Sequence, residues 1–165
     1  CKNGHADVVR LLIDRNCSIE CEDIWQRRPI HHASEKGHAD VVRLLIDHNC
    51  DIECEDNEQM RPIHYVSIYG YADVVRLLIY YNCNIECEDN EQWRPIHYAS
   101  EDCHTDIVKL LIDRNCNIEC ENNEQRRQIH WAGEDGHAEI IQLLMLNKCQ
   151  IECKTKVKYF HFKYS

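Results

Sequence analysis

The sequence contains no run of about 18 apolar residues, so we expect no membrane-spanning helix. It also lacks an initiator methionine and a charged-then-apolar leader, so no signal peptide is recognisable. There is no Gly-rich phosphate loop, no Gly-x-Ser-x-Gly elbow and no His-Glu-x-x-His motif. Carboxylates are plentiful, but they recur at a fixed spacing instead of gathering at one place. We therefore expect no enzyme active site and no cofactor.

Positive charge is scarce along most of the chain. The net charge is −10, and residues 154–165 contain four lysines and no acid, which leaves −14 for the first 153 residues. An acidic body disfavours nucleic acid and anionic membranes as partners. A hydrophobic content of 44% over 165 residues suits one soluble domain with a sizeable core.

The cysteines that are present follow a repeat. Ten of the twelve form five pairs spaced by 33 residues, and only Cys1 and Cys103 stand outside that pattern. The five pairs are Cys17/Cys21, Cys50/Cys54, Cys83/Cys87, Cys116/Cys120 and Cys149/Cys153. A fixed period of this length indicates a stacked array of similar units.

Three segments recur with the cysteines. "RPIHYAS" has three close variants, "GHADVVRLLID" has three more, and "NCNIECED" or a variant of it closes each unit. Pro29, Pro62 and Pro95 suit the first position of a helix, and Gly37 or Gly70 suits the position just past its end. A second helix follows, with a broad apolar stripe that a lone helix pair cannot bury, so the units must stack.

These segments resemble ankyrin repeats. The resemblance covers residues 1 to about 154 and implies an all-α repeat solenoid, in which each unit has a β-hairpin tip and two antiparallel helices. It implies a partial repeat over residues 1–22, so we expect the chain to be a fragment of a longer ankyrin repeat protein. The expected full repeats are 23–55, 56–88, 89–121 and 122–154, followed by a basic, aromatic tail at 155–165.

Three departures from the family pattern recur in every unit. Glutamine replaces the tip glycine, and we expect Asn57, Asn90 or Asn123 to adopt the left-handed conformation instead. Arginine replaces the helix-capping threonine, and glutamate replaces the loop asparagine. Because both change together, we predict a ladder of Arg–Glu contacts along the loop bases. Its members are Arg28, Arg61, Arg94 and Arg127 with Glu20, Glu53, Glu86 and Glu119.

The paired cysteines occupy positions that the resemblance assigns to small, buried residues. A metal site and redox chemistry are the alternatives, but stacked units place equivalent residues about 8–10 Å apart, too far for a disulfide or a shared zinc ion. The resemblance also implies that one histidine per unit ties a helix start to a neighbouring loop: His31, His64, His97 and His130. We therefore expect no metal ion. Reduced thiols in this number favour a cytoplasmic location.

Two further predictions concern packing. The leucine pair of each second helix should be buried: Leu11/Leu12, Leu44/Leu45, Leu77/Leu78, Leu110/Leu111 and Leu143/Leu144. In the tail, Phe160, Phe162 and Tyr164 alternate with polar residues. They either cover the last unit or belong to a frayed end.

The resemblance implies a protein–protein interaction module that binds through its concave face, at the tips and the ends of the first helices. There the unit at 56–88 differs from its neighbours, because Ile68 and Tyr69 replace charged residues. Large apolar residues at these places are typical of interfaces. The candidate contact residues are Trp25, Met60, Ile68, Tyr69 and Trp93.

The acidic tips favour a protein partner with a basic rim. We expect the chain itself to be a monomer. Two alternatives remain open: a structural spacer within a larger protein, and a thiol or metal-binding protein. Tyr65, Tyr98 and Trp131 recur at one position and are predicted to be packing residues more than contacts.

Overall fold

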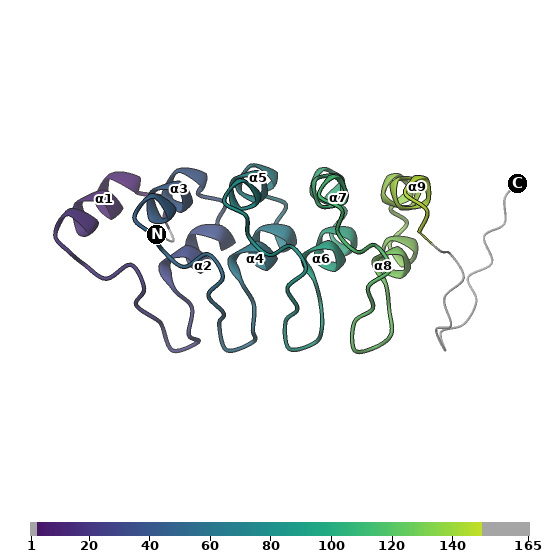
Figure 1. Ribbon diagram of the computed structural model, residues 1–165, viewed down its shortest axis with the longest axis horizontal. Helices are drawn as coiled ribbons and strands as arrows, with labels where there is room; N and C mark the ends of the chain where they lie inside the picture. Colours follow the sequence, from purple (N-terminus) through teal and green to yellow (C-terminus); the bar gives the residue numbers. More distant parts are fainter. Residues whose placement is uncertain (1–2, 150–165) are drawn as a thin grey trace, which may run out of the picture.

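The computed structural model describes residues 3–149, and the predicted tail at 155–165 lies outside this part. Within it the chain forms nine α-helices and no strand. Figure 1 shows them as two rows, with loops extending below. Helices α2 (Pro29–Glu35), α4 (Pro62–Ile68), α6 (Pro95–Glu101) and α8 (Gln128–Glu134) form one row. Helices α1 (Ala6–Asp14), α3 (Ala39–Asp47), α5 (Ala72–Tyr80), α7 (Thr105–Asp113) and α9 (Ala138–Leu146) form the other.

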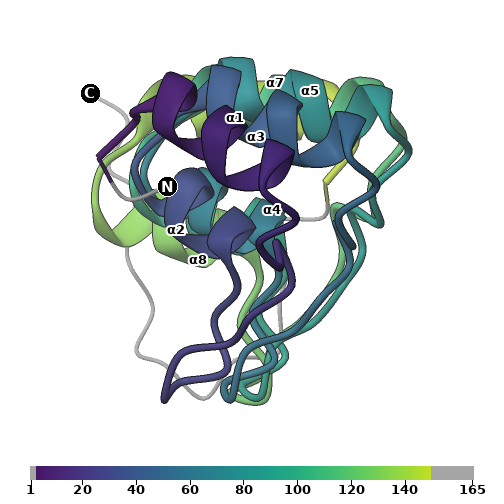
Figure 2. The ribbon, with the colours of Figure 1, turned by 90° about the vertical axis from the view of Figure 1, so that its left-hand side faces the viewer.

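The predicted helical repeat solenoid is confirmed. We call α2 with α3 the first unit, and α4/α5, α6/α7 and α8/α9 the second, third and fourth. Helices α2, α4, α6 and α8 are the first helices of their units, and the second helices contain nine residues each, α1 included. Within each unit the two helices pack against each other, and each helix packs against the equivalent helix of an adjacent unit. Viewed along the array, the loop tips of successive units lie behind one another on the same side, below the two rows of helices (Figure 2).

Each first helix is preceded by an N-cap arginine in extended conformation, and its first residue is proline in three units. A guanidinium has no acceptor, so the cap is made differently. The Nδ1 atom of His64 accepts the N–H of Arg61 at 2.9 Å, and the N–H of His64 is donated to the Arg61 carbonyl. Gly70 ends the turn after α4 with a φ of 78°. The conformation is one that glycine adopts without steric cost.

The core lies between the two rows. Val41, Val42 and Leu45 of α3 are fully buried, as are the equivalent residues of α5. The prediction for the leucine pairs holds fully only for Leu44/Leu45 and Leu77/Leu78. Leu110 and Leu143 are only partly buried, and in α1 the prediction is wrong, because Leu11 and Leu12 are 55% and 48% exposed. No described first helix lies beside α1 as α2 lies beside α3. Val8, Leu11 and Leu12 of α1 are therefore exposed, whereas Val9 is buried.

The tips correct a second prediction. The left-handed residue is the glutamine and not the asparagine, with φ near 60° at Gln26, Gln59, Gln92 and Gln125. In the second unit Asp56 fixes the turn, because its Oδ1 accepts the N–H groups of Glu58 and Met60 at 2.9 Å each. The N–H of Asp56 is donated to the Met60 carbonyl at 3.1 Å. This geometry places residue 59 in the left-handed region, and the tip is a closed turn without the β-strands that the resemblance implied.

Candidate functional site

The loop bases carry a ladder of ion pairs. In each of the four units the guanidinium lies against the glutamate that the sequence pairs with it. The Nη1–Oε2 distance is 2.6 Å for Arg28–Glu20 and 2.5 Å for Arg94–Glu86. Arg61–Glu53 and Arg127–Glu119 form the same contact. A second glutamate, two residues later, pairs with each arginine as well.

The ladder also joins neighbouring loops. Glu53 holds Arg61 with one carboxylate oxygen, and its Oε1 accepts the N–H of Asn84 at 2.7 Å. Glu20 accepts the N–H of Asp51 in the same way, at 3.0 Å. One glutamate therefore fixes two loop segments 31 residues apart in sequence.

Three histidines at the helix starts, His31, His64 and His97, are fully buried, and His130 is partly buried. Nε2 of His64 lies 3.2 Å from the Cys87 carbonyl, and Nε2 of His97 lies 3.1 Å from that of Cys120. Burial lowers the pKa of His97 to about 4, and it also lowers the pKa of His31, His64 and His130. Nδ1 of His130 accepts the N–H of Arg127 at 2.8 Å. Each ring therefore links its own helix start, and in three units the next loop, without carrying charge.

The paired cysteines of the second and third units are buried. Cys83, Cys87, Cys116 and Cys120 are at most 8% exposed, and burial raises the pKa of each thiol to about 12. The Sγ of Cys120 lies 3.5 Å from Nε2 of His97. Among residues 3–149, no group of three or more His, Cys, Asp or Glu side chains is arranged to hold a metal ion. Cys17, Cys21 and Cys103 are exposed.

One side chain in each first helix meets the loop tip. Tyr65 donates its hydroxyl hydrogen bond to Asp56 at 2.5 Å, and Tyr98 donates to Asp89. Burial and the carboxylate raise the pKa of both tyrosines. In the fourth unit Trp131 replaces tyrosine, and the Cζ of Arg126 lies 3.4 Å from its ring centroid. These rings pack between helix and tip.

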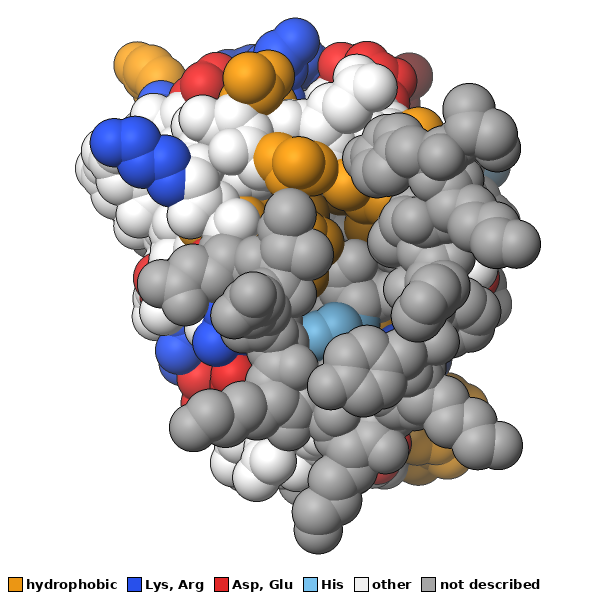
Figure 3. Space-filling model, turned by 90° about the vertical axis from the view of Figure 1, so that its right-hand side faces the viewer, with side chains coloured by type: hydrophobic (Ala, Val, Ile, Leu, Met, Phe, Trp, Pro, Cys, Tyr) orange, Lys and Arg blue, Asp and Glu red, His pale blue; other side chains and the backbone are white. Residues whose placement is uncertain are grey.

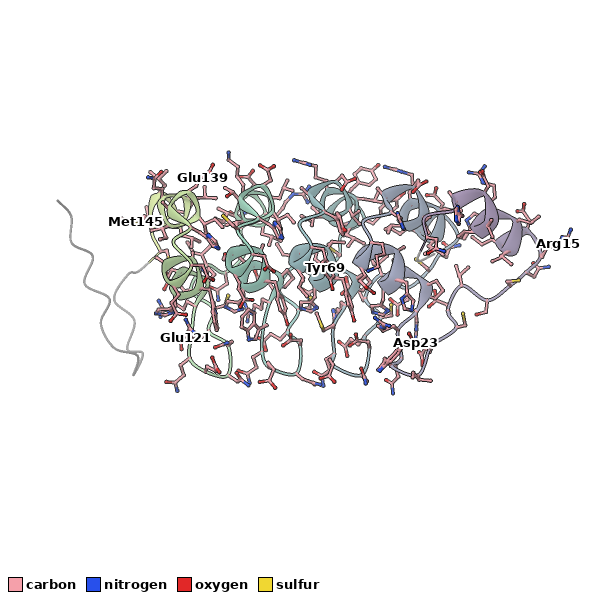
Figure 4. The ribbon with its side chains drawn as sticks, turned by 180° about the vertical axis from the view of Figure 1, so that it is seen from behind. Arg15, Asp23, Tyr69, Glu121, Glu139 and Met145 are labelled. Carbon is pink, nitrogen blue, oxygen red and sulfur yellow. The ribbon has the colours of Figure 1, made fainter. Side chains whose placement is uncertain are left out.

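The predicted contact residues are not all alike. Tyr69 is 48% exposed at the end of α4, where Figure 4 shows it in the row of first helices near the middle of the array. Its ring centroid lies 6.4 Å from that of Tyr71. Ile68, just before it, and Met60 at the tip of the same unit are partly buried. We call Met60, Ile68 and Tyr69 the second-unit patch.

The two tryptophans of the prediction lie apart from this patch. Trp93 is partly buried, with its ring centroid 4.8 Å from those of Tyr98 and Trp131, so packing holds most of its surface. Trp25 is 50% exposed on the first tip, where Arg27 lies over its ring at 4.9 Å. The structure thus groups Trp93 with the third and fourth units and leaves Trp25 at the first.

Sequence reasoning missed other exposed apolar residues. Tyr80 at the end of α5 is 73% exposed and contacts Tyr81, with the ring centroids 5.2 Å apart. The signal was in the repeat, because Asp47 and Asp113 occupy the position of Tyr80 in the neighbouring units. At the end of the array, Leu146 of α9 is 81% exposed, and Figure 3 shows hydrophobic side chains on that face.

A comparison with protein-family models identifies the repeats. The model described as "Ankyrin repeats (3 copies)" matches residues 1–89 and 63–156. A search of the curated proteins found no match. Within residues 3–149, the helices are too short and too polar to cross a bilayer. Ankyrin repeats are generally protein–protein interaction modules and typically lack enzymatic activity. The family model covers most of the chain, and the stacked helix pairs agree with it, so this chain belongs to the ankyrin repeat family.

Proposed function

We propose that this array binds a protein partner through the face formed by its loop tips and first helices, with the second-unit patch at the centre. The observation that carries the proposal is the exposed Tyr69 beside Ile68. The neighbouring units have charged pairs there: Glu35-Lys36, Glu101-Asp102 and Glu134-Asp135. An apolar, aromatic patch on an acidic surface is what an interface core requires.

The rim around the patch supports a partner of a particular charge. Glu55, Glu58, Glu88 and Glu91 are exposed on the loops beside and below it. Carboxylates at a rim speed the association of a basic surface more than they strengthen the final complex. The proposed partner is therefore a protein with an apolar anchor and a basic surround. Trp25 and Trp93 contribute at the edges of this surface.

The charged residues at the equivalent positions of the other units suggest the substitutions that test this proposal. Changing Ile68→Glu together with Tyr69→Asp gives the second unit the residues of its neighbours. A matched control is Tyr80→Asp on α5, which also replaces an exposed aromatic side chain of the second unit by the residue that its neighbours carry. Both variants should fold like the original chain, as far-ultraviolet circular dichroism and thermal unfolding will report.

The measurement is the affinity of a partner captured from cell extract by cross-linking and then purified. We expect the double variant to lose binding and Tyr80→Asp to keep it. Equal binding by all three proteins would place the site elsewhere on the array. If the original chain binds no protein specifically, the alternative that it is a structural spacer within a larger protein is favoured.

A further inference from the structure

In the first and fourth units a residue of the loop tip contacts the residue eight positions later, at the end of the first helix. Nη1 of Arg27 lies 3.3 Å from Oε2 of Glu35, and Nη2 of Arg126 lies 2.5 Å from Oε2 of Glu134. The four pairs are Arg27 with Glu35, Met60 with Ile68, Trp93 with Glu101, and Arg126 with Glu134. Three pairs match in character, since two are ionic and one is apolar. The third unit breaks the rule.

In that unit Trp93 takes the place of the arginine. It stacks on Tyr98 as Arg126 stacks on Trp131, so the packing is kept while the charge is lost. The carboxylate of Glu101 consequently forms no ion pair with any residue in the described part of the chain.

The surroundings of Glu101 add to this imbalance. Burial raises the pKa of Glu101, and the nearby carboxylates of Asp102 and Asp135 raise it further. Arg126 lowers it, but its guanidinium is held by Glu134. Neither Asp102 nor Asp135 forms an ion pair among residues 3–149. In the first unit, by contrast, both Arg27 and Lys36 contact Glu35.

We infer that Glu101 receives an arginine side chain of the protein partner, in the place that Arg27 and Arg126 fill within their own units. The inference rests on the proposed function and names one feature of its partner. The array itself supplies the template, because it twice sets a guanidinium against the glutamate at this position. A partner arginine would give the third unit the charge that its own tip lacks.

Arginine fits better than lysine for two reasons. The guanidinium is planar and stacks on aromatic rings while it pairs with a carboxylate, as Arg126 does with Trp131 and Glu134. It is also more weakly hydrated, which suits a half-buried site beside Tyr98 and Trp93. The flanking Asp102 and Asp135 would attract the cation further.

The position of Glu101 also relates this arginine to the apolar anchor. Ile68 and Glu101 are equivalent residues of adjacent units, and the carbonyl of Ile68 accepts a hydrogen bond from His104 of the third unit at 2.8 Å. Adjacent units are about 10 Å apart, which three residues of extended chain span. The partner segment is therefore one with an apolar side chain and an arginine at that separation.

The test uses N-acetyl-arginine amide as the probe, with the lysine and citrulline amides for comparison. Citrulline has the shape of arginine without its charge. Nuclear magnetic resonance reports the Glu101 carboxyl carbon and the Trp93 indole N–H during titration of the whole chain. We expect the arginine probe to lower the pKa of Glu101 and to shift both signals, and the citrulline probe to leave them unchanged.

Two variants and one control sharpen the result. Glu101→Gln should weaken the response of Trp93 to the arginine probe about two- to fivefold, the range of a single exposed ion pair. Trp93→Arg should lower the pKa of Glu101 without probe and block the probe, because the unit then supplies its own arginine. Glu35→Gln makes the same change two units away and should leave the response intact.

The inference is overturned if citrulline or lysine amide acts as strongly as arginine amide, if neither signal responds to the arginine probe, or if Glu101→Gln responds like the original chain. The capture experiment with the Ile68 and Tyr69 variant tests the proposed function separately. A partner lost by that variant, together with no response to arginine, rejects this inference alone.

Discussion

His97 reaches the carbonyl of Cys120, 23 residues further along the chain, with its Nε2 3.1 Å from the oxygen. Its Nδ1 accepts the N–H of Arg94 at 3.0 Å, so the proton of the neutral ring lies on Nε2. The ring has room for no second proton without losing the bond to Arg94. This makes the array sensitive to acid.

We expect the free energy of unfolding to fall as the pH is lowered from about 6.5 to about 4. Burial lowers the pKa of His97 to about 4 from the ordinary histidine value of 6.5, so between these pH values the unfolded chain binds a proton that the folded chain does not. The stabilisation is complete above 6.5 and lost below 4, and His97 alone accounts for about 3 kcal/mol. Urea unfolding at pH 7 and pH 4.5 measures the loss. His97→Gln should show a smaller pH dependence; an unchanged slope would contradict the assignment.

The second-helix leucines should differ sharply in their contribution to stability. Leu78→Ala removes a fully buried side chain between two units and should cost about 2–5 kcal/mol. Leu12→Ala, at the equivalent position of α1, removes one that is 48% exposed and should cost less than about 1 kcal/mol. Chemical denaturation compares the two. Equal losses would mean that α1 is covered in solution.

The two glutamates that pair with Arg61 should also differ. Glu53→Ala breaks the ion pair and leaves the N–H of Asn84 without its acceptor, at a cost of about 1–2 kcal/mol. Glu55→Ala removes only an exposed ion pair and should cost less than about 0.5 kcal/mol. Thermal unfolding at low and high salt separates the charge from the hydrogen bond. If high salt abolished the destabilisation caused by Glu53→Ala, the hydrogen bond from the Asn84 N–H would contribute nothing to stability.

Cys103 occupies the left-handed position that Gly37, Gly70 and Gly136 hold in the other units, with a φ of 60°. A side chain there costs about 1–2 kcal/mol, partly offset because glycine loosens the unfolded chain. Cys103→Gly should therefore raise the free energy of unfolding by about 0.5–1 kcal/mol. Cys103→Ala keeps the Cβ atom and should give no such gain. If Cys103→Ala also raised the free energy of unfolding, the thiol group and not the backbone conformation would be the source of the destabilisation.

Thiol reactivity should follow burial. Cys17, Cys21 and Cys103 are exposed, whereas Cys50, Cys54, Cys83 and Cys87 are buried, and burial raises their pKa to about 12. Iodoacetamide at pH 8, read by peptide mass spectrometry, should label the exposed group quickly and the buried group only after denaturant is added. Fast labelling of Cys83 in the folded protein would revive a redox function.

The period of 33 residues predicted the helical solenoid because a repeated apolar stripe has only one way to be buried, by stacking. The joint change of arginine and glutamate likewise pointed to contacts that the structure contains, such as Arg94 with Glu86. The left-handed residue of the tip was beyond such reasoning. Asparagine adopts the left-handed conformation more readily than glutamine does. The hydrogen bonds of the Asp56 side chain nevertheless close the turn so that Gln59 has the positive φ.

The exposure of individual apolar side chains could not be predicted from the repeat pattern either. Leu12 and Leu45 stand in the same local pattern, yet one faces water and the other is fully buried, because burial depends on which helix lies alongside. Trp93 is a similar case, since its neighbours Tyr98 and Trp131 come from two units. The lack of an ion-pair partner for Glu101 in the described part of the chain could have been predicted from the sequence. It required comparing, in every unit, the tip residue with the residue eight positions later.

The tips of adjacent units are joined by single backbone hydrogen bonds, such as the one from Asn57 to the Trp25 carbonyl at 3.1 Å. Helix contacts likewise run mainly between neighbours. Such an array responds to mechanical load like a short spring: tension applied to its two ends is carried by every junction in turn. Small bends at each junction add up along the length. Helix α1 has one buried side chain where α3 and α5 have five each, so we expect the junction at α1 to yield first under load.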